Sequence, residues 1–104
     1  MADTTLRDPL GRTMILHDHT WHGHILPGHP EMKQLRSLVE RAVTDPLEIR
    51  ISDAAPRNVR LFFGVGPRKG IMIVVVAEVI QGFVKTAHVI KKTKGALEWS
   101  RPTP

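Results

Sequence analysis

The feature of this sequence that most restricts its fold is a change of hydrophobic period at Leu47. From there to Ile90, apolar residues recur mostly at every second position, in short runs separated by turn-forming residues. Such alternation is typical of β-strands, whose successive side chains point to opposite faces of a sheet. The pattern predicts four strands, over residues 47–52, 59–65, 71–80 and 83–90.

The connections between these strands are short. Gly66–Gly70 and the pair Gln81-Gly82 have the composition of hairpin loops, which join neighbouring antiparallel strands. The run from Ile71 to Ala77 is apolar at consecutive positions, so we expect it to be central in the sheet with both faces buried. The four strands should therefore form an antiparallel meander.

The segment before the strands changes to a helical period. One set of apolar residues recurs at steps of three and four: Met32, Leu35, Leu38, Val39, Ala42 and Val43. This spacing predicts an amphipathic helix with one buried face. Pro30 suits its first turn, and Thr44-Asp45-Pro46 ends it.

A shorter helix is expected over Trp21–Leu26. Asp18 or Thr20 can cap its first turn, and Pro27-Gly28 should stop it. The sequence thus predicts an α+β fold, in which two N-terminal helices pack on one face of a four-stranded antiparallel β-meander.

A chain of 104 residues is of a size for a single domain, residues 1–104, with one core. We expect residues 1–12 to be a loosely held, flexible arm and residues 100–104 to be an open tail. There is no cysteine, no apolar stretch typical of a signal peptide, and no apolar run long enough to cross a bilayer as a helix. These features indicate a cytoplasmic protein.

The charge balance favours an anionic partner. Fifteen Lys and Arg against ten Asp and Glu give a formal net charge of +5 at pH 7. Nucleic acid is the commonest partner for such a surface, although a basic surface can also serve solubility alone. The basic residues gather in the second half of the chain, at Arg57, Arg60, Arg68, Lys69, Lys85, Lys91, Lys92 and Lys94.

Five of the six histidines fall in one short segment before the longer helix. Histidine can carry a proton near neutral pH, and its neutral ring binds metals. We expect His24 in the short helix and His29 at the entrance of the longer one, where free backbone N–H groups favour a phosphate. The spacing of His17, His19 and His22 matches no structural zinc motif, so no metal site is predicted and their roles stay open.

Three residues of the predicted strands can join such chemistry. Arg60 alternates with Val59 and Leu61, so its guanidinium should point away from their core, free either for solvent or for a phosphate. Thr86 and His88 share one face of the last predicted strand, where threonine is also simply a good strand former. P-loop, GxGxxG and GxSxG motifs are missing, and aromatic residues for base stacking are few.

Four short motifs follow one another along the chain: Trp21-x-x-His24-Ile25, His29-Pro30-Glu31-Met32, Asp45-Pro46 and Val84-Lys85-Thr86-Ala87. In this order they resemble the phage- and toxin-associated nucleases of the barnase–EndoU–colicin–RelE (BECR) fold. The resemblance covers about residues 21–97. The chain departs from the RelE branch because it has no tyrosine.

The resemblance implies a small metal-independent endoribonuclease without a cofactor, of the kind that mobile elements carry as toxins or effectors. RNA supplies its own nucleophile, the 2′-hydroxyl, so the protein needs only to move protons and stabilise charge. The matching catalytic positions are His24, His29, Arg60 and Thr86, with the two histidines as the acid–base pair. Substrate contacts are expected from Arg57, Lys85, His88 and Lys91.

The expected partners are RNA and, for a toxin, an acidic antitoxin or immunity protein. The apolar run that begins at Ile71 could also serve a homo-oligomer. The alternative hypothesis is a basic module that binds nucleic acid or protein without catalysis. Cleavage of RNA in the presence of EDTA separates the two.

Overall fold

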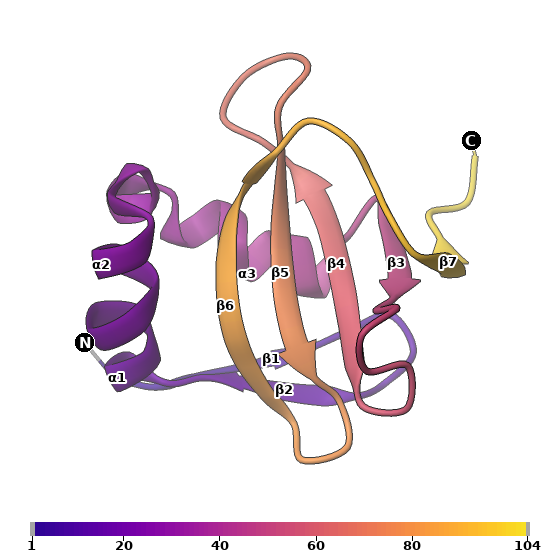
Figure 1. The fold of residues 1–104 in the computed structure, drawn as a ribbon, viewed down its shortest axis with the longest axis horizontal. Coiled ribbons are helices and arrows are strands. Elements are labelled where there is room, and N and C mark those ends of the chain that lie inside the picture. Colours follow the sequence, from indigo (N-terminus) through magenta and orange to yellow (C-terminus); the bar gives the residue numbers. More distant parts are fainter. Residues whose placement is uncertain (1, 104) are drawn as a thin grey trace.

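The structure is a computed structural model that describes residues 2–103. Its strands form one curled sheet in the order β1-β2-β6-β5-β4-β3-β7 (Figure 1). The strands are β1 Thr4–Arg7, β2 Thr13–Leu16, β3 Glu48–Ile51, β4 Val59–Val65, β5 Met72–Glu78, β6 Phe83–Ile90 and β7 Ala96–Ser100. The helical segments are α1 Asp18–Thr20, η1 Trp21–Ile25, α2 Leu26–Gly28, η2 Pro30–Gln34 and α3 Arg36–Thr44.

The predicted fold class is wrong. The four predicted strands correspond to β3–β6, which do pair consecutively and antiparallel. However, β1 and β2 extend this sheet on one side and β7 extends it on the other, so the sheet has seven strands within residues 2–103 rather than four. The sheet is also mixed, because β2 runs parallel to β6, where Ile15 pairs with Phe83.

The helices differ from the prediction as well. Helical backbone runs through α1, η1 and α2 without a break, from Asp18 to Gly28, and η1 is a π-helical turn. The predicted helix over residues 30–44 is divided at Leu35 into a 3₁₀ turn and α3. The helices do not lie together on one face: α3 covers one face of the sheet, whereas the helix of residues 18–28 lies beside β6 (Figure 1).

The segment expected to be a flexible arm is instead built into the sheet. β1 and β2 form a hairpin whose turn is organised by Asp8, a buried carboxylate. One oxygen of Asp8 accepts hydrogen bonds from the backbone N–H groups of Leu10 and Arg12, and the other accepts one from the Arg12 guanidinium at 2.7 Å. Gly11 has a φ of 82°, which glycine adopts without strain. At the other end, Ser100 belongs to β7, and the Arg101 N–H donates to Leu47.

A charged cluster joins distant parts of the curled sheet. The Glu98 carboxylate on β7 accepts hydrogen bonds at 2.7 Å from Arg12, which follows the β1–β2 turn, and from Arg60 on β4. Burial by itself raises the pKa of Glu98, but the hydrogen bonds from the two guanidinium groups, supported by their charge, lower that pKa below its ordinary value of 4.5. Glu98 therefore stabilises the fold in its ionised form.

We expect acid to weaken this cluster. A carboxylate whose pKa is lower in the folded chain contributes stability that is complete above its unfolded pKa and is lost as the pH falls through the folded pKa. In Glu98→Gln, the free energy of unfolding at neutral pH should fall by roughly 2 kcal/mol, as for a hydrogen-bonded charged group. This variant should also lose less stability than the wild type between pH 6 and a pH below 4.5. Urea unfolding across this range measures both effects; equal pH slopes in the two proteins would contradict this role of Glu98.

The core occupies both faces of the central strands. On the face covered by α3, Phe62, Ile73 and Val75 are fully buried together with Val39 and Ala42 of the helix. On the opposite face, Leu61, Phe63 and Val74 form a smaller cluster. None of the helices in residues 2–103 is long and apolar enough to cross a membrane.

Candidate functional site

The free edge of β6 receives the histidine-rich helix. β6 pairs with β5 along one edge, while its pairing with β2 on the other edge is at Phe83, the first residue of β6. The remainder of that edge faces the helix of residues 18–28, as its place beside β6 in Figure 1 shows. Trp21 and Ile25 anchor this helix in the core, and the Arg36 guanidinium lies over the Trp21 ring at 5.2 Å.

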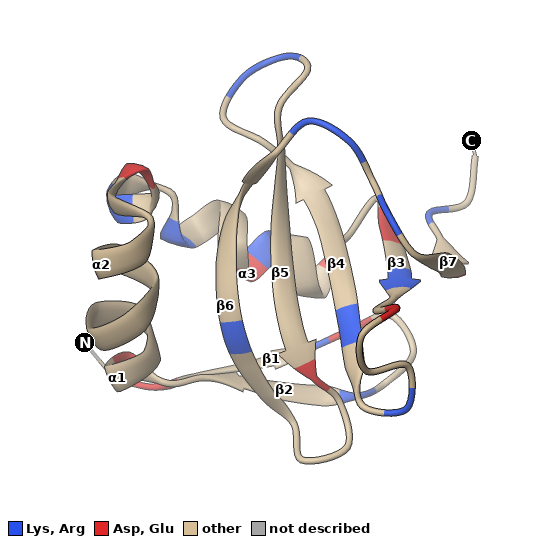
Figure 2. Ribbon diagram, viewed as in Figure 1, with Lys and Arg blue, Asp and Glu red and all other residues tan. Residues whose placement is uncertain are grey.

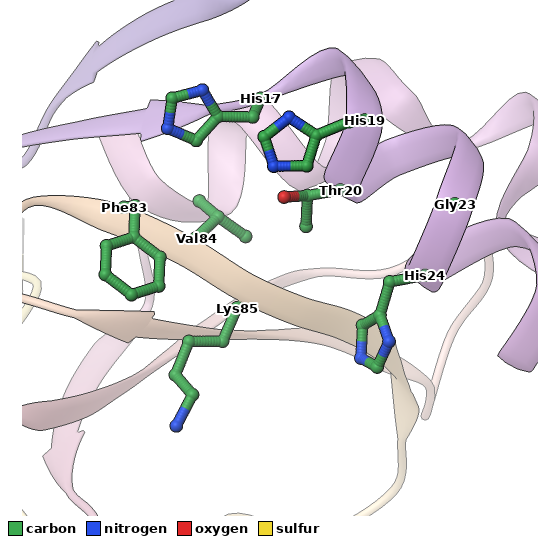
Figure 3. Close-up of a pocket in the computed structure, with 8 residues that line it drawn as sticks. All are labelled: His17, His19, Thr20, Gly23, His24, Phe83, Val84 and Lys85. Atoms are coloured by element: carbon green, nitrogen blue, oxygen red, sulfur yellow. The ribbon is translucent and has the colours of Figure 1, made fainter.

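A hollow of about 590 Å³ opens between this helix and the start of β6. Figure 3 shows His24, from the helix, and Lys85, from the strand, lining it from two sides. The helix also contributes His19, Thr20 and Gly23, and His17 lines the hollow from just before the helix. Thr20 and His24 are four residues apart, so they share one helix face. The π-helical turn that carries His24 is a distortion often found at functional sites.

A β-bulge exposes Lys85. Ala77 of β5 pairs with Val84 and Val76 pairs with Thr86, so Lys85 is an extra residue without a partner in the β5–β6 register. Such a bulge re-aims the side chain of the extra residue, and here the Lys85 ammonium is exposed at the hollow. Lys85, expected from the sequence to bind substrate, is thus placed beside His24.

His88 and His29 form a second cluster further along β6. Their rings stack with centroids 5.0 Å apart. The Nδ1 atom of His88 lies 3.0 Å from the carbonyl oxygen of Val89. Because a carbonyl oxygen only accepts, Nδ1 must carry the hydrogen, which leaves Nε2 of the neutral ring as a proton acceptor. Thr86 shares a sheet face with His88, since their β5 partners, Val76 and Val74, are two residues apart.

We expected His29 at the entrance of a long helix, and this prediction is wrong. His29 precedes the short 3₁₀ turn η2, and α3 begins only at Arg36. In the described part of the chain, no long helix therefore begins beside His29 where it could bind a phosphate. The Nδ1 atom of His29 instead lies 3.6 Å from the Glu31 carboxylate.

Arg60 does not join the other predicted catalytic residues. It pairs with Ala77 of β5, whereas Thr86 pairs with Val76, so Arg60 and Thr86 point to opposite faces of the sheet. The Arg60 guanidinium is engaged by Glu98 and by the carbonyl oxygens of Pro56 and Val59. Its role in this structure is therefore to hold β4 to β7.

The remaining predicted substrate contacts lie at opposite ends of the sheet. Arg57 is exposed in the loop before β4, level with the start of β6 but two strands away from it. Lys91 follows the other end of β6. A single binding surface near β6 can include Lys91 more readily than Arg57.

Of the three histidines whose roles were open, His17 and His22 lie beside carboxylates. His17 lies 3.0 Å from Asp3 and stacks on His19, and His22 lies 3.4 Å from Asp18. Asp3 also accepts a hydrogen bond from the Asp18 N–H at the start of the helix, and this bond, with that from His17, lowers the pKa of Asp3. Among residues 2–103, no group of three or more His, Cys, Asp or Glu side chains is arranged to hold a metal ion.

Among the residues that line the hollow, His17, His19 and Thr20 were not predicted as site residues. The helix was expected to begin at Trp21, but Asp3 caps it from a distant part of the chain and it begins at Asp18. With the earlier start, the spacing of Thr20 and His24 would have placed them on one helix face.

Comparison with protein-family models, curated proteins and solved structures finds no match to this chain. The resemblance to BECR nucleases therefore depends on the short motifs quoted above.

Proposed function

We propose that this protein is a small metal-independent endoribonuclease that cleaves RNA by 2′-hydroxyl transesterification at the edge of β6. The observation that supports this proposal is the arrangement of proton carriers: His24 lies at one end of the segment Lys85–His88, and the His29–His88 stack lies at the other. An ammonium and a hydroxyl, from Lys85 and Thr86, lie between them along the strand.

In this proposal one phosphodiester lies between His24 and the His29–His88 stack. Lys85 and His88 are three residues apart, which corresponds to about 10 Å along a strand. The stacked rings of His29 and His88 leave no room for a phosphate between them at 5.0 Å. They therefore act on one side of the phosphorus as a unit, and His24 acts on the other.

Each group has a role that follows from its placement. The Nε2 atom of His88 accepts the 2′-hydroxyl proton while that oxygen attacks the phosphorus, and His29 packs against the His88 ring. His24 donates a proton to the departing 5′-oxygen. Lys85 and Thr86 stabilise the charge on the non-bridging oxygens. The products are a 2′,3′-cyclic phosphate and a 5′-hydroxyl, and the active site needs no metal.

The partners and location follow as parts of the same proposal. The protein acts in the cytoplasm on RNA, and an acidic antitoxin or immunity protein restrains it by covering the basic side of the molecule. Figure 2 shows that side: the β4–β5 loop and the connection after β6 both carry basic residues. A homo-oligomer is compatible with this arrangement.

RNA cleavage in EDTA tests the proposal. The purified protein should cut a single-stranded RNA in EDTA, leave 2′,3′-cyclic phosphate ends, and fail to cut the same sequence made of 2′-deoxynucleotides, because the deoxy strand lacks the nucleophile. Gel analysis with mass spectrometry of the ends gives each result. Binding of RNA without any cleavage would instead support the non-catalytic module.

A further inference from the structure

A second hollow, of about 580 Å³, lies between η2 and the loop of the β4–β5 hairpin. Its walls are largely apolar and include Leu35, Ile71 and Val89. Two cations, Arg68 and Lys91, also line it. The hollow thus combines an apolar slot with positive charge, which suits a ligand that has both a flat apolar part and an anionic part.

This hollow adjoins the proposed catalytic residues. Glu31, which lines it, lies 3.6 Å from His29. Val89, which also lines it, directly follows His88 and supplies the carbonyl oxygen that holds the His88 ring. A ligand in the hollow would therefore be next to the His29–His88 stack.

The two cations are available to a ligand. Within residues 2–103, neither Arg68 nor Lys91 forms an ion pair or a side-chain hydrogen bond. Both side chains belong to exposed residues, and both also line an adjoining hollow together with Lys69. Positive charge is therefore concentrated at the edge of the second hollow, where it attracts an anionic ligand.

We propose that the second hollow is a nucleotide subsite: it takes the base of the nucleotide next to the cleaved bond, and Arg68 and Lys91 bind that nucleotide's phosphate. A planar base fills a slot with apolar walls, and its removal from water favours binding. A guanidinium and an ammonium suit the phosphate. This inference rests on the proposed function, because RNA is what brings a base and a phosphate to this place together.

Methyl NMR with a mononucleotide tests the subsite. The probe is adenosine 3′-monophosphate, titrated into protein with labelled Leu, Ile and Val methyl groups. Signals of Leu35, Ile71 and Val89 should shift with saturation. Adenosine alone should shift the same methyl signals, but with an affinity at least about tenfold weaker, because the phosphate contacts are missing. Shifts confined to methyl groups elsewhere, such as Val84 at the first hollow, would overturn the proposal.

Charge variants provide the matched control. The double variant Arg68→Ala/Lys91→Ala should bind the mononucleotide with an affinity at least about tenfold lower, because two contacts to the phosphate are lost. The double variant Arg7→Ala/Lys94→Ala removes the same number of charges at exposed residues that do not line the second hollow, and it should leave the affinity unchanged. Equal weakening by both would mean that only net charge matters, and would contradict a subsite.

The subsite and the proposed function can fail separately. If the wild type does not cleave RNA but the mononucleotide shifts the three methyl groups, the subsite stands as a binding site and the nuclease assignment fails. If RNA is cleaved with 2′,3′-cyclic phosphate ends while those methyl groups do not respond, the subsite is wrong and the catalytic residues are not affected.

Discussion

Replacing His88 by alanine is expected to lower the rate constant of RNA cleavage by about 10²–10⁴-fold, the range for a general acid or base. His24→Ala should have an effect of the same size, since it removes the other proton carrier. The combined variant should be little worse than either single one, because groups that act as a unit are not additive. Single-turnover cleavage of a labelled oligonucleotide measures all three.

His22→Ala is the matched control. His22 and His24 are both exposed residues of the same π-helical turn, but His22 lies 3.4 Å from Asp18 and does not line the hollow. The His22→Ala variant should cleave RNA at the wild-type rate. Loss of activity in His22→Ala together with full activity in His24→Ala would show that the acid is wrongly assigned.

A large loss of stability is expected at Gly64, where β4 touches α3. A Cβ atom at Gly64 would lie 2.6 Å from the Cβ atom and 2.7 Å from the Cα atom of Ala42, so the helix backbone would have to move. Gly64→Val should therefore lower the free energy of unfolding by about 3 kcal/mol or more. Urea denaturation followed by circular dichroism measures this loss.

Two comparisons make this prediction specific. Gly28→Ala meets nothing within 4 Å and should change stability by less than about 1 kcal/mol. Ala42→Gly should recover part of the loss caused by Gly64→Ala, even though glycine within a helix costs about 1 kcal/mol. A Gly64→Val protein as stable as the wild type would contradict the close packing of α3 on β4.

The central strands could be predicted from the sequence because their pattern is local. Alternating apolar residues and glycine-containing turns indicate β4 and β6 at the bounds that the structure has, Val59–Val65 and Phe83–Ile90. β1 and β7 have four and five residues and too few apolar positions to show a period. Their places depend on contacts between residues far apart in the sequence, such as Arg12 with Glu98.

The site could be predicted only in part, for similar reasons. Histidine chemistry indicated His24 and His29, and the strand pattern placed Thr86 and His88 on one face. Alternation also placed Arg60 on the face of the strand that Leu61 does not share. It cannot show that both faces of β4 are buried, with Phe62 on one face and Leu61 on the other. The bulge at Lys85 depends on the β5 partner and has no signal in β6 alone.

The assignment of His24 as acid and His88 as base is the central claim, and a substrate with a sulfur leaving atom tests it most directly. When the 5′-bridging oxygen at the cleaved bond is replaced by sulfur, the leaving thiolate needs no proton, so general acid help is no longer required. His24→Ala should then cleave this RNA at close to the wild-type rate, whereas His88→Ala should stay roughly 10²-fold or more slower. Equal defects of both variants on the sulfur substrate, or rescue of His88→Ala instead, would contradict the account.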